Sequence, residues 1–226
     1  MSDPPIRNAA TILVIRDADT TPKVLMGQRG ANAVFMPSKF VFPGGAVDME
    51  DADVPLTQAI TSPCRERLGE ESALPASTLA IAAIRELWEE TGQILGTPAA
   101  WPNPPIDWES FAATGHRPSA LHMYYIFRAI TPAGRPRRFD ARFFLVDARH
   151  LASDPDDFSA ACEELSHIHW VPLDEALALD LPFITEVVLH ELIGLMPHLA
   201  APASVPVFKN SDEDNLFIRL GRAASA

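Results

Sequence analysis

Residues 85–92, which read RELWEETG, constrain the fold more than any other part of this chain. The apolar spacing upstream of them predicts a helix that begins near Ser77, a good N-cap residue, and ends at Gly92. On that helix Glu86, Glu89 and Glu90 are separated by steps of three and four, so three carboxylates crowd one face. Such crowding destabilises a helix at neutral pH unless a cation lies between the charges. Hard cations such as Mg²⁺ take oxygen ligands, so the segment predicts a divalent-metal site; the alternative is a solvated acidic face.

The rest of the chain mixes strands and helices without a βαβ rhythm. Runs of β-branched and aromatic residues predict strands over residues 10–16, 24–29, 39–42, 122–131, 139–147 and 168–171. Helical patterns lie at residues 108–113, 173–178 and 183–196. Residues 48–76 are mixed and contain prolines, so we expect a partly helical excursion on the surface. Together these patterns predict one α+β domain built on a mixed sheet.

The net charge restricts the partners of the chain. Its 226 residues fit one large domain and carry 18 basic against 30 acidic side chains, a formal charge of −12. Affinity for nucleic acids comes from Lys and Arg, so we expect no nucleic-acid partner. An anionic substrate would need metal ions or a local basic cluster to offset this charge. No secretory signal or uninterrupted apolar span is visible, and Cys64 and Cys162 stand alone. We therefore expect a cytoplasmic protein without a membrane partner or a structural zinc site.

The segment RELWEETG resembles the core of the Nudix box, whose pattern is G-x5-E-x7-R-E-U-x-E-E-x-G-U, where U is aliphatic. Residues 42–51, FPGGAVDMED, resemble its beginning, with Gly45 as the opening glycine. The chain departs from the pattern in three ways. Asp51 stands where the pattern has its first Glu, 33 residues separate Asp51 from Arg85 where the pattern has seven, and Gln93 takes the final aliphatic position.

The long interruption and Asp51 resemble a subgroup of Nudix hydrolases typified by the peroxisomal coenzyme A diphosphatase. A downstream block, RRFD at residues 137–140 with FFL at residues 143–145, is similar to a segment of that subgroup. The resemblance implies a Nudix fold, an α/β/α sandwich around a mixed sheet. It also implies a single domain over residues 1–226, with an insertion at about residues 52–77 and a helical C-terminal extension from about residue 180.

The resemblance further implies a reaction, the hydrolysis of a nucleoside diphosphate linked to another group, with Mg²⁺ or Mn²⁺ as cofactor. The implied metal ligands are the box glutamates and one carbonyl: Gly45, Glu86, Glu89 and Glu90. Arg85 would orient Glu89. The general base in this family is either a box glutamate such as Glu86 or a later Glu. Glu163 and Glu164 precede an expected strand here, and we favour Glu164, although exposed loop acids are the alternative.

Substrate contacts are expected from arginines. Arg29 ends the second strand, where the family often has a substrate-facing arginine. Arg137 and Arg138 belong to the densest basic cluster, with Arg135 and Arg142, and arginine suits phosphate geometry. The alternative is that this cluster pairs with neighbouring acids such as Asp140 and Asp147.

The subgroup implies CoA or acyl-CoA as substrate, with 3′,5′-ADP and (acyl-)phosphopantetheine as products. ADP-ribose or NADH is a second option, because specificity in this fold lies in loops rather than in the box. A Nudix-fold nucleotide sensor without turnover is a third. The apolar helix at residues 183–196 leaves a homodimer open as well.

Overall fold

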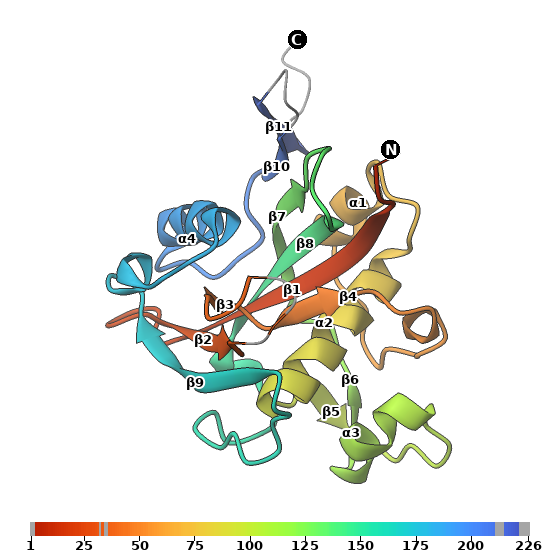
Figure 1. Ribbon diagram of the computed structural model, residues 1–226. Helices are drawn as coiled ribbons and strands as arrows, with labels where there is room; N and C mark the ends of the chain where they lie inside the picture. The colour runs from red at the N-terminus through yellow and green to blue at the C-terminus, as the bar shows by residue number, and fades with distance from the viewer. Residues whose placement is uncertain (1–2, 32, 34–35, 211–214, 222–226) are drawn as a thin grey trace.

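The computed structural model describes residues 3–31, 33, 36–210 and 215–221. Over these residues nine strands form a mixed sheet in the order β11-β10-β7-β8-β1-β2-β3, with β4 paired to β1 and β9 paired to β2 (Figure 1). The pairs β1–β8 and β10–β7 are parallel, and the other pairs are antiparallel. The strands are β1 (Ile6–Arg16), β2 (Lys23–Arg29), β3 (Phe40–Val41), β4 (Gly44–Ala46), β7 (Tyr124–Ile130), β8 (Arg138–Asp147), β9 (Leu165–Pro172), β10 (Val205–Asn210) and β11 (Asn215–Leu220).

The remaining elements cover or flank this sheet. A separate two-stranded sheet pairs β5 (Gly96–Pro98) with β6 (His116–Pro118). The helices are α1 (Cys64–Gly69), α2 (Ala76–Thr91), α3 (Glu109–Ala113) and α4 (Phe183–Leu195). Within the described residues no helix is both long enough and apolar enough to cross a bilayer. Residues 173–178 form only the 3-10 turn Ala176–Ala178, so the helix expected there is wrong.

Helices cover both faces of the main sheet, because its central strand is apolar on both sides. Successive side chains of β1 point to opposite faces. Ile12 and Val14 pack in one core cluster with α2, whereas Leu13 and Ile15 pack in a second cluster with α4. This layering confirms the expected α/β/α sandwich of the α+β class.

Helix α2 carries the acidic segment and forms as the sequence predicts, except at its start. It begins at Ala76 after Pro75, and no side chain caps it, so Ser77 lies inside the helix rather than at its N-cap. Gly92 ends it in a left-handed conformation (φ 71°), and its N–H donates to the Trp88 carbonyl at 2.7 Å.

Residues 48–76 are mostly exposed and contain the short helix α1, as expected, but the insertion also contributes side chains to the core. The side chains of Val54, Ile60, Cys64 and Leu68 are buried in the core cluster on the α2 side. Because α2 already begins at Ala76, the inserted segment ends at Pro75.

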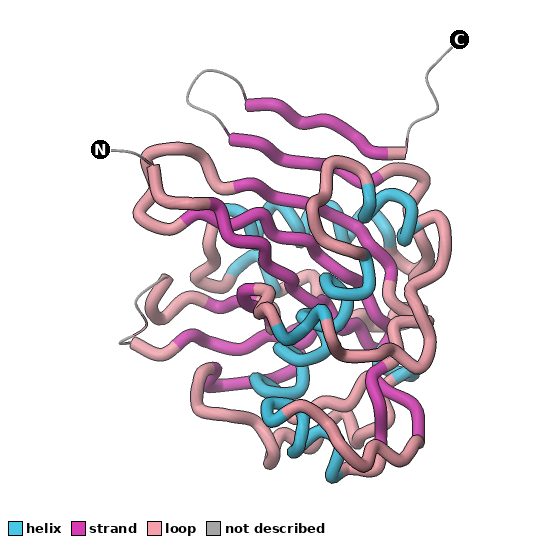
Figure 2. The backbone as a smooth tube through the Cα atoms, turned by 90° about the vertical axis from the view of Figure 1, so that its right-hand side faces the viewer, coloured by secondary structure: helices cyan, strands magenta, loops and turns pink. Residues whose placement is uncertain are grey.

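The C-terminal extension is only partly helical. Helix α4 appears where expected, but β10 and β11 follow it and enter the main sheet, with β10 parallel to β7. Figure 2 shows these two strands continuing the sheet at its upper edge. Val205 and Val207 are fully buried, and this contact with the core explains why a Pro-rich segment is held as a strand.

Candidate active site

The insertion separates Asp51 from Arg85 and the box glutamates in sequence. In the folded chain a buried ion pair joins Asp51 to Arg85. Arg85 Nε donates to Asp51 Oδ1 at 2.9 Å, and Arg85 Nη2 donates to Asp51 Oδ2 at 3.1 Å. The Arg85 side chain is 7% exposed and that of Asp51 is 1% exposed. A two-point arginine–carboxylate contact of this kind fixes orientation as well as distance.

Arg85 also holds the acids on its own helix. Its Nη1 donates to Glu86 Oε1 at 3.0 Å and to Glu89 Oε2 at 3.2 Å, and its Nη2 donates to the Ala46 carbonyl at 3.0 Å. The contact with Glu89 was expected from the spacing of four residues. With its donors bound to protein acceptors, Arg85 positions carboxylates.

Glu86 and Glu90 face the turn that opens the motif. Strand β4 packs on α2 (Figure 1), and a Cβ atom at Gly45 would lie 2.6 Å from Cδ of Glu86. Only glycine leaves room for the carboxylate at that point. The Gly44 N–H donates to Glu90 Oε2 at 2.8 Å. Sequence reasoning missed this donor, although the Gly-Gly turn signalled a close approach of the backbone.

Burial is the main cause of the raised pKa values of Glu86 and Glu90. It raises the pKa of Glu86 to about 7, with Arg85 lowering it and Glu89 raising it further. Burial also raises the pKa of Glu90 well above its usual range; the charge of Glu86 adds to this rise, and the Gly44 N–H opposes it. When both buried carboxylates are ionised they repel each other. A positive charge bound close to them would relieve this repulsion.

Known proteins similar to the chain give its family. No protein-family model matches it. A Caenorhabditis elegans protein named "Putative nudix hydrolase 7" is 33% identical over 189 residues, which are 76% of this chain and 55% of that protein. The crystal structure of a NUDIX hydrolase from Alicyclobacillus acidocaldarius is 27% identical, with a TM-score of 0.64 over 84% of this chain and 92% of the other. The chain belongs to the Nudix hydrolase superfamily. It spans about half the length of the C. elegans relative.

The third glutamate of the Nudix box is more exposed than the other two. The Glu89 side chain is 38% exposed and turns toward Arg85. Burial raises its pKa, while Arg85 lowers it. In the part of the chain that the structure describes, no three Asp, Glu, His or Cys side chains come close enough to enclose a metal ion by themselves.

The chemistry of the Nudix-box donors nevertheless fits a divalent cation. Glu86 and Glu90 are 8% and 2% exposed and contribute oxygen ligands from one helix. Their mutual repulsion is the feature that a bound cation would offset. Glu89 is on the same helix, one turn from Glu86, and its neighbour Arg85 already holds both carboxylates.

Two residues outside the Nudix box, Arg29 and Glu164, lie near this site, and their roles as substrate contact and general base stay predictions. Arg29 ends β2, Glu164 directly precedes β9, and Arg29 Nη2 lies 3.2 Å from Glu164 Oε1. Both charges act on Glu90, Glu164 raising its pKa and Arg29 lowering it. Glu163, the other candidate base, is exposed.

The structure does not bring Arg137 and Arg138 to the Nudix box, and their role as substrate contacts stays a prediction. Arg138 pairs with Ile6 on β1, four residues before the row that contains Gly45, a separation of about 13 Å along the strand. Its Nη1 lies 3.6 Å from Asp3, and its Nε donates to the Thr131 carbonyl at 3.4 Å. Arg137 is exposed in the β7–β8 turn.

Arg142, the buried member of the basic cluster, pairs with a neighbouring acid, as the alternative predicted. Arg142 is buried and lies 3.1 Å from Asp140, which also accepts two hydrogen bonds from Arg128. Arg128 in turn donates to the Glu71 carbonyl at 3.0 Å. These contacts attach the end of the insertion to the sheet.

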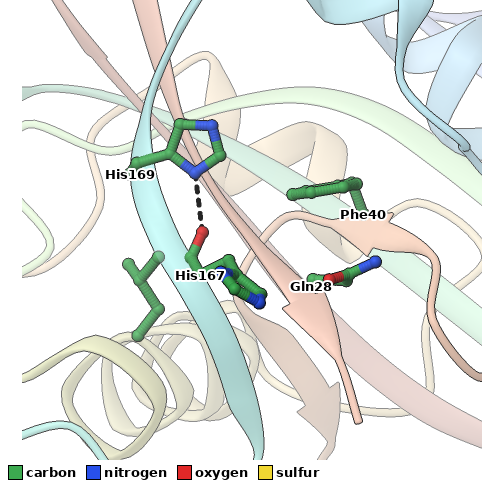
Figure 3. A pocket seen from close by; sticks show the side chains of 5 residues that line it. Gln28, Phe40, His167 and His169 are labelled. Carbon is green, nitrogen blue, oxygen red and sulfur yellow. Dashed lines mark hydrogen bonds between the residues drawn. The ribbon is translucent and has the colours of Figure 1, made fainter. Parts of the chain in front are cut away.

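An open depression of about 540 Å³ lies beside this site but on the other face of the sheet. Gln28 lines it, and because Gln28 and Arg29 are consecutive in β2 their side chains point to opposite faces. Figure 3 shows Phe40 and His169 next to each other there, with ring centroids 5.9 Å apart. Within the depression His169 Nδ1 lies 2.6 Å from the His167 carbonyl. The depression is therefore separate from the acids of α2.

Proposed function

We propose that this chain is a divalent-metal-dependent Nudix pyrophosphohydrolase that cleaves the pyrophosphate of a nucleoside diphosphate linked to another group. One observation carries the proposal. The buried Glu86 and Glu90 face the Gly44-Gly45 turn, and Arg85 and Asp51 rejoin the interrupted motif around them. Membership of the Nudix superfamily supports the same reaction class.

The proposed ligands of Mg²⁺ or Mn²⁺ are the carboxylates of Glu86, Glu89 and Glu90 and the Gly45 carbonyl. The cation, when bound, neutralises phosphate charge and acidifies water. Arg85 Nη1 donates to both Glu86 and Glu89, so one guanidinium group would hold these two proposed ligands in place.

Glu164 is the proposed general base, and Arg29 is the proposed phosphate contact. The ion pair between the two supports these roles, because a carboxylate can accept a proton and an arginine suits a phosphate group. Arg29 is 20% exposed and Glu164 is 54% exposed, so both can be reached from solvent.

We propose CoA or acyl-CoA as the substrate, cleaved to 3′,5′-ADP and (acyl-)phosphopantetheine. The support is the resemblance to the CoA diphosphatase subgroup in the insertion and in Asp51. The downstream RRFD block lends less support, because Asp140 is engaged by the buried Arg128 and Arg142. ADP-ribose or NADH is the second candidate substrate, and a sensor without turnover is the third reading.

The wider organisation is proposed on the same basis. Residues 1–226 would form one Nudix domain, in which the insertion and the C-terminal strands are integral. Both cysteines are free thiols, which supports a reducing compartment such as the cytoplasm. Phe183 on α4 is 62% exposed and supports a homodimer contact through that helix.

Product analysis by mass tests the proposal. The purified chain is incubated with CoA, acetyl-CoA, ADP-ribose or NADH, each with MgCl₂ or MnCl₂, beside a Glu90→Gln variant. Formation of 3′,5′-ADP from CoA by the wild type alone supports the reaction and the substrate. Products only from ADP-ribose or NADH would keep the reaction and overturn the substrate. No products with either metal would favour the sensor.

A further inference from the structure

A buried glutamine takes the final aliphatic position of the Nudix box. Gln93 is fully buried, and its side chain makes three hydrogen bonds with one loop. Nε2 donates to the Asp157 carbonyl at 2.8 Å and to the Asp154 carbonyl at 3.2 Å, and Oε1 accepts from Ser153 Oγ at 2.8 Å. Both amide hydrogens are used, so the contact fixes the amide in one orientation, which an aliphatic side chain could not do.

The loop that Gln93 holds runs from residue 151 to residue 164 and ends at Glu164. Further contacts attach this β8–β9 loop to the same end of α2. The Ile94 N–H donates to Ser153 Oγ at 3.0 Å, and the Cys162 N–H donates to the Glu89 carbonyl at 2.8 Å. Figure 1 shows the loop beside the C-terminal end of α2, below β9.

Helix α2 therefore carries the box acids and also the anchor for the loop. Glu90 and Gln93 are three residues apart on the chain, so their positions relative to each other are nearly fixed. If the loop moved relative to Gln93, Glu164 would move relative to Glu90. The Glu164 side chain is 54% exposed and bonds to Arg29, and its placement depends on the backbone that leads to it.

We propose that Gln93 is a positioning residue, which holds the β8–β9 loop so that the Glu164 carboxylate stays in reach of the site formed by Glu86 and Glu90. This inference rests on the proposed function, in which Glu164 is the general base. This positioning role explains why a glutamine stands where the Nudix pattern has an aliphatic residue. The hydrolysis reaction itself does not require a glutamine there.

A double-mutant cycle of Gln93→Leu and Glu164→Gln tests the inference. The readouts are kcat and KM with CoA and MgCl₂, or with ADP-ribose if that is the substrate cleaved. Gln93→Leu is expected to lower kcat by about 10- to 100-fold and to change KM by less than about threefold, because it misplaces a reacting group. In the Glu164→Gln background the same change is expected to alter kcat by less than about twofold.

A matched control separates positioning from general damage. Gln58 Oε1 accepts from Ser119 Oγ at 3.1 Å in the insertion, so Gln58→Leu removes a similar bond far along the chain from the β8–β9 loop and should leave kcat unchanged. If Gln93→Leu does not fold, Ser153→Ala removes one of the same bonds from the loop side and replaces it in the cycle.

The outcomes distinguish the inference from the proposed function. Equal losses from Gln93→Leu in both backgrounds, or no loss in either, would overturn the positioning role while Glu164 remains the base. Full activity of Glu164→Gln would overturn both the base assignment and the role of Gln93. In that case metal-dependent turnover by the wild type would still support the hydrolase.

Discussion

Replacing Asp51 with asparagine removes the charge that pairs with Arg85 across the insertion and keeps the size of the side chain. Breaking a buried ion pair by removing one partner typically costs about 3–5 kcal/mol. Arg85 retains Glu86 and Glu89, so we expect the lower end, about 3 kcal/mol of unfolding free energy. For a domain of this size such a loss lowers Tm by about 6–12 °C.

Asp48 provides the matched control. It also lies near Arg85, with Arg85 Nη2 at 3.4 Å from its Oδ2, but its side chain is 54% exposed. Exposed ion pairs are worth about 1 kcal/mol or less, so Asp48→Asn should change stability by no more than that. Urea unfolding followed by circular dichroism, in metal-free buffer, measures both variants. The reasoning would be refuted if the two substitutions cost the same within about 0.5 kcal/mol.

Three further predictions concern the site. Gly45→Ala should lower kcat by about 100-fold with little change in Tm, because its Cβ displaces the Glu86 carboxylate, whereas Gly44→Ala meets the Thr11 backbone and should lower Tm. Burial raises the pKa of Glu86 to about 7, so its protonated form is favoured by folding. The contribution of Glu86 to metal-free stability should therefore be fully present below about pH 4.5 and be lost as the pH rises through 7. Glu86→Gln should weaken the loss of stability between pH 4.5 and 8, and the part that remains should come from Glu90, whose pKa burial also raises. Arg29→Ala should raise KM by about tenfold or more, and Arg138→Ala by less than about twofold.

The measurements for these predictions are standard. Steady-state kinetics and thermal melts compare the two glycine variants, and equal losses of activity without any difference in Tm would contradict the assignment of Gly45. Melts in EDTA from pH 4.5 to 8 compare wild type with Glu86→Gln; a difference in Tm that does not change over this range would contradict the raised pKa of Glu86. Equal KM values for the two arginine variants would contradict the placement of Arg29 at the site.

The site on α2 could be predicted from the sequence because its signals are local. The spacing of Glu86, Glu89 and Glu90, and the glycine that ends the helix, are properties of a single element. The two buried faces of β1 follow from its unbroken run of apolar residues, because successive side chains of a strand point to opposite faces. The contact of Glu89 with Arg85 follows from their separation of four residues.

What the sequence could not predict depends on contacts between distant segments. Val54, Ile60 and Leu68 are irregularly spaced among prolines and charges, so no period indicates that these side chains of the insertion enter the core. Strand β10 is a short, Pro-containing segment stabilised by pairing with β7 on one side and with β11 on the other. Arg138 is close to basic neighbours in sequence, but strand register places it away from the site. The role of Gln93 appears only when the β8–β9 loop is seen against α2.

Binding of Mn²⁺ followed by electron paramagnetic resonance tests the central claim most directly, because it detects the cation without depending on the substrate. The claim is that Glu86 and Glu90 form a divalent-metal site, so Glu90→Gln should weaken Mn²⁺ binding by about tenfold or more. Glu163→Gln, a change of the same kind in the exposed loop, should bind as the wild type does. Equal Mn²⁺ affinity in wild type and Glu90→Gln would contradict the claim.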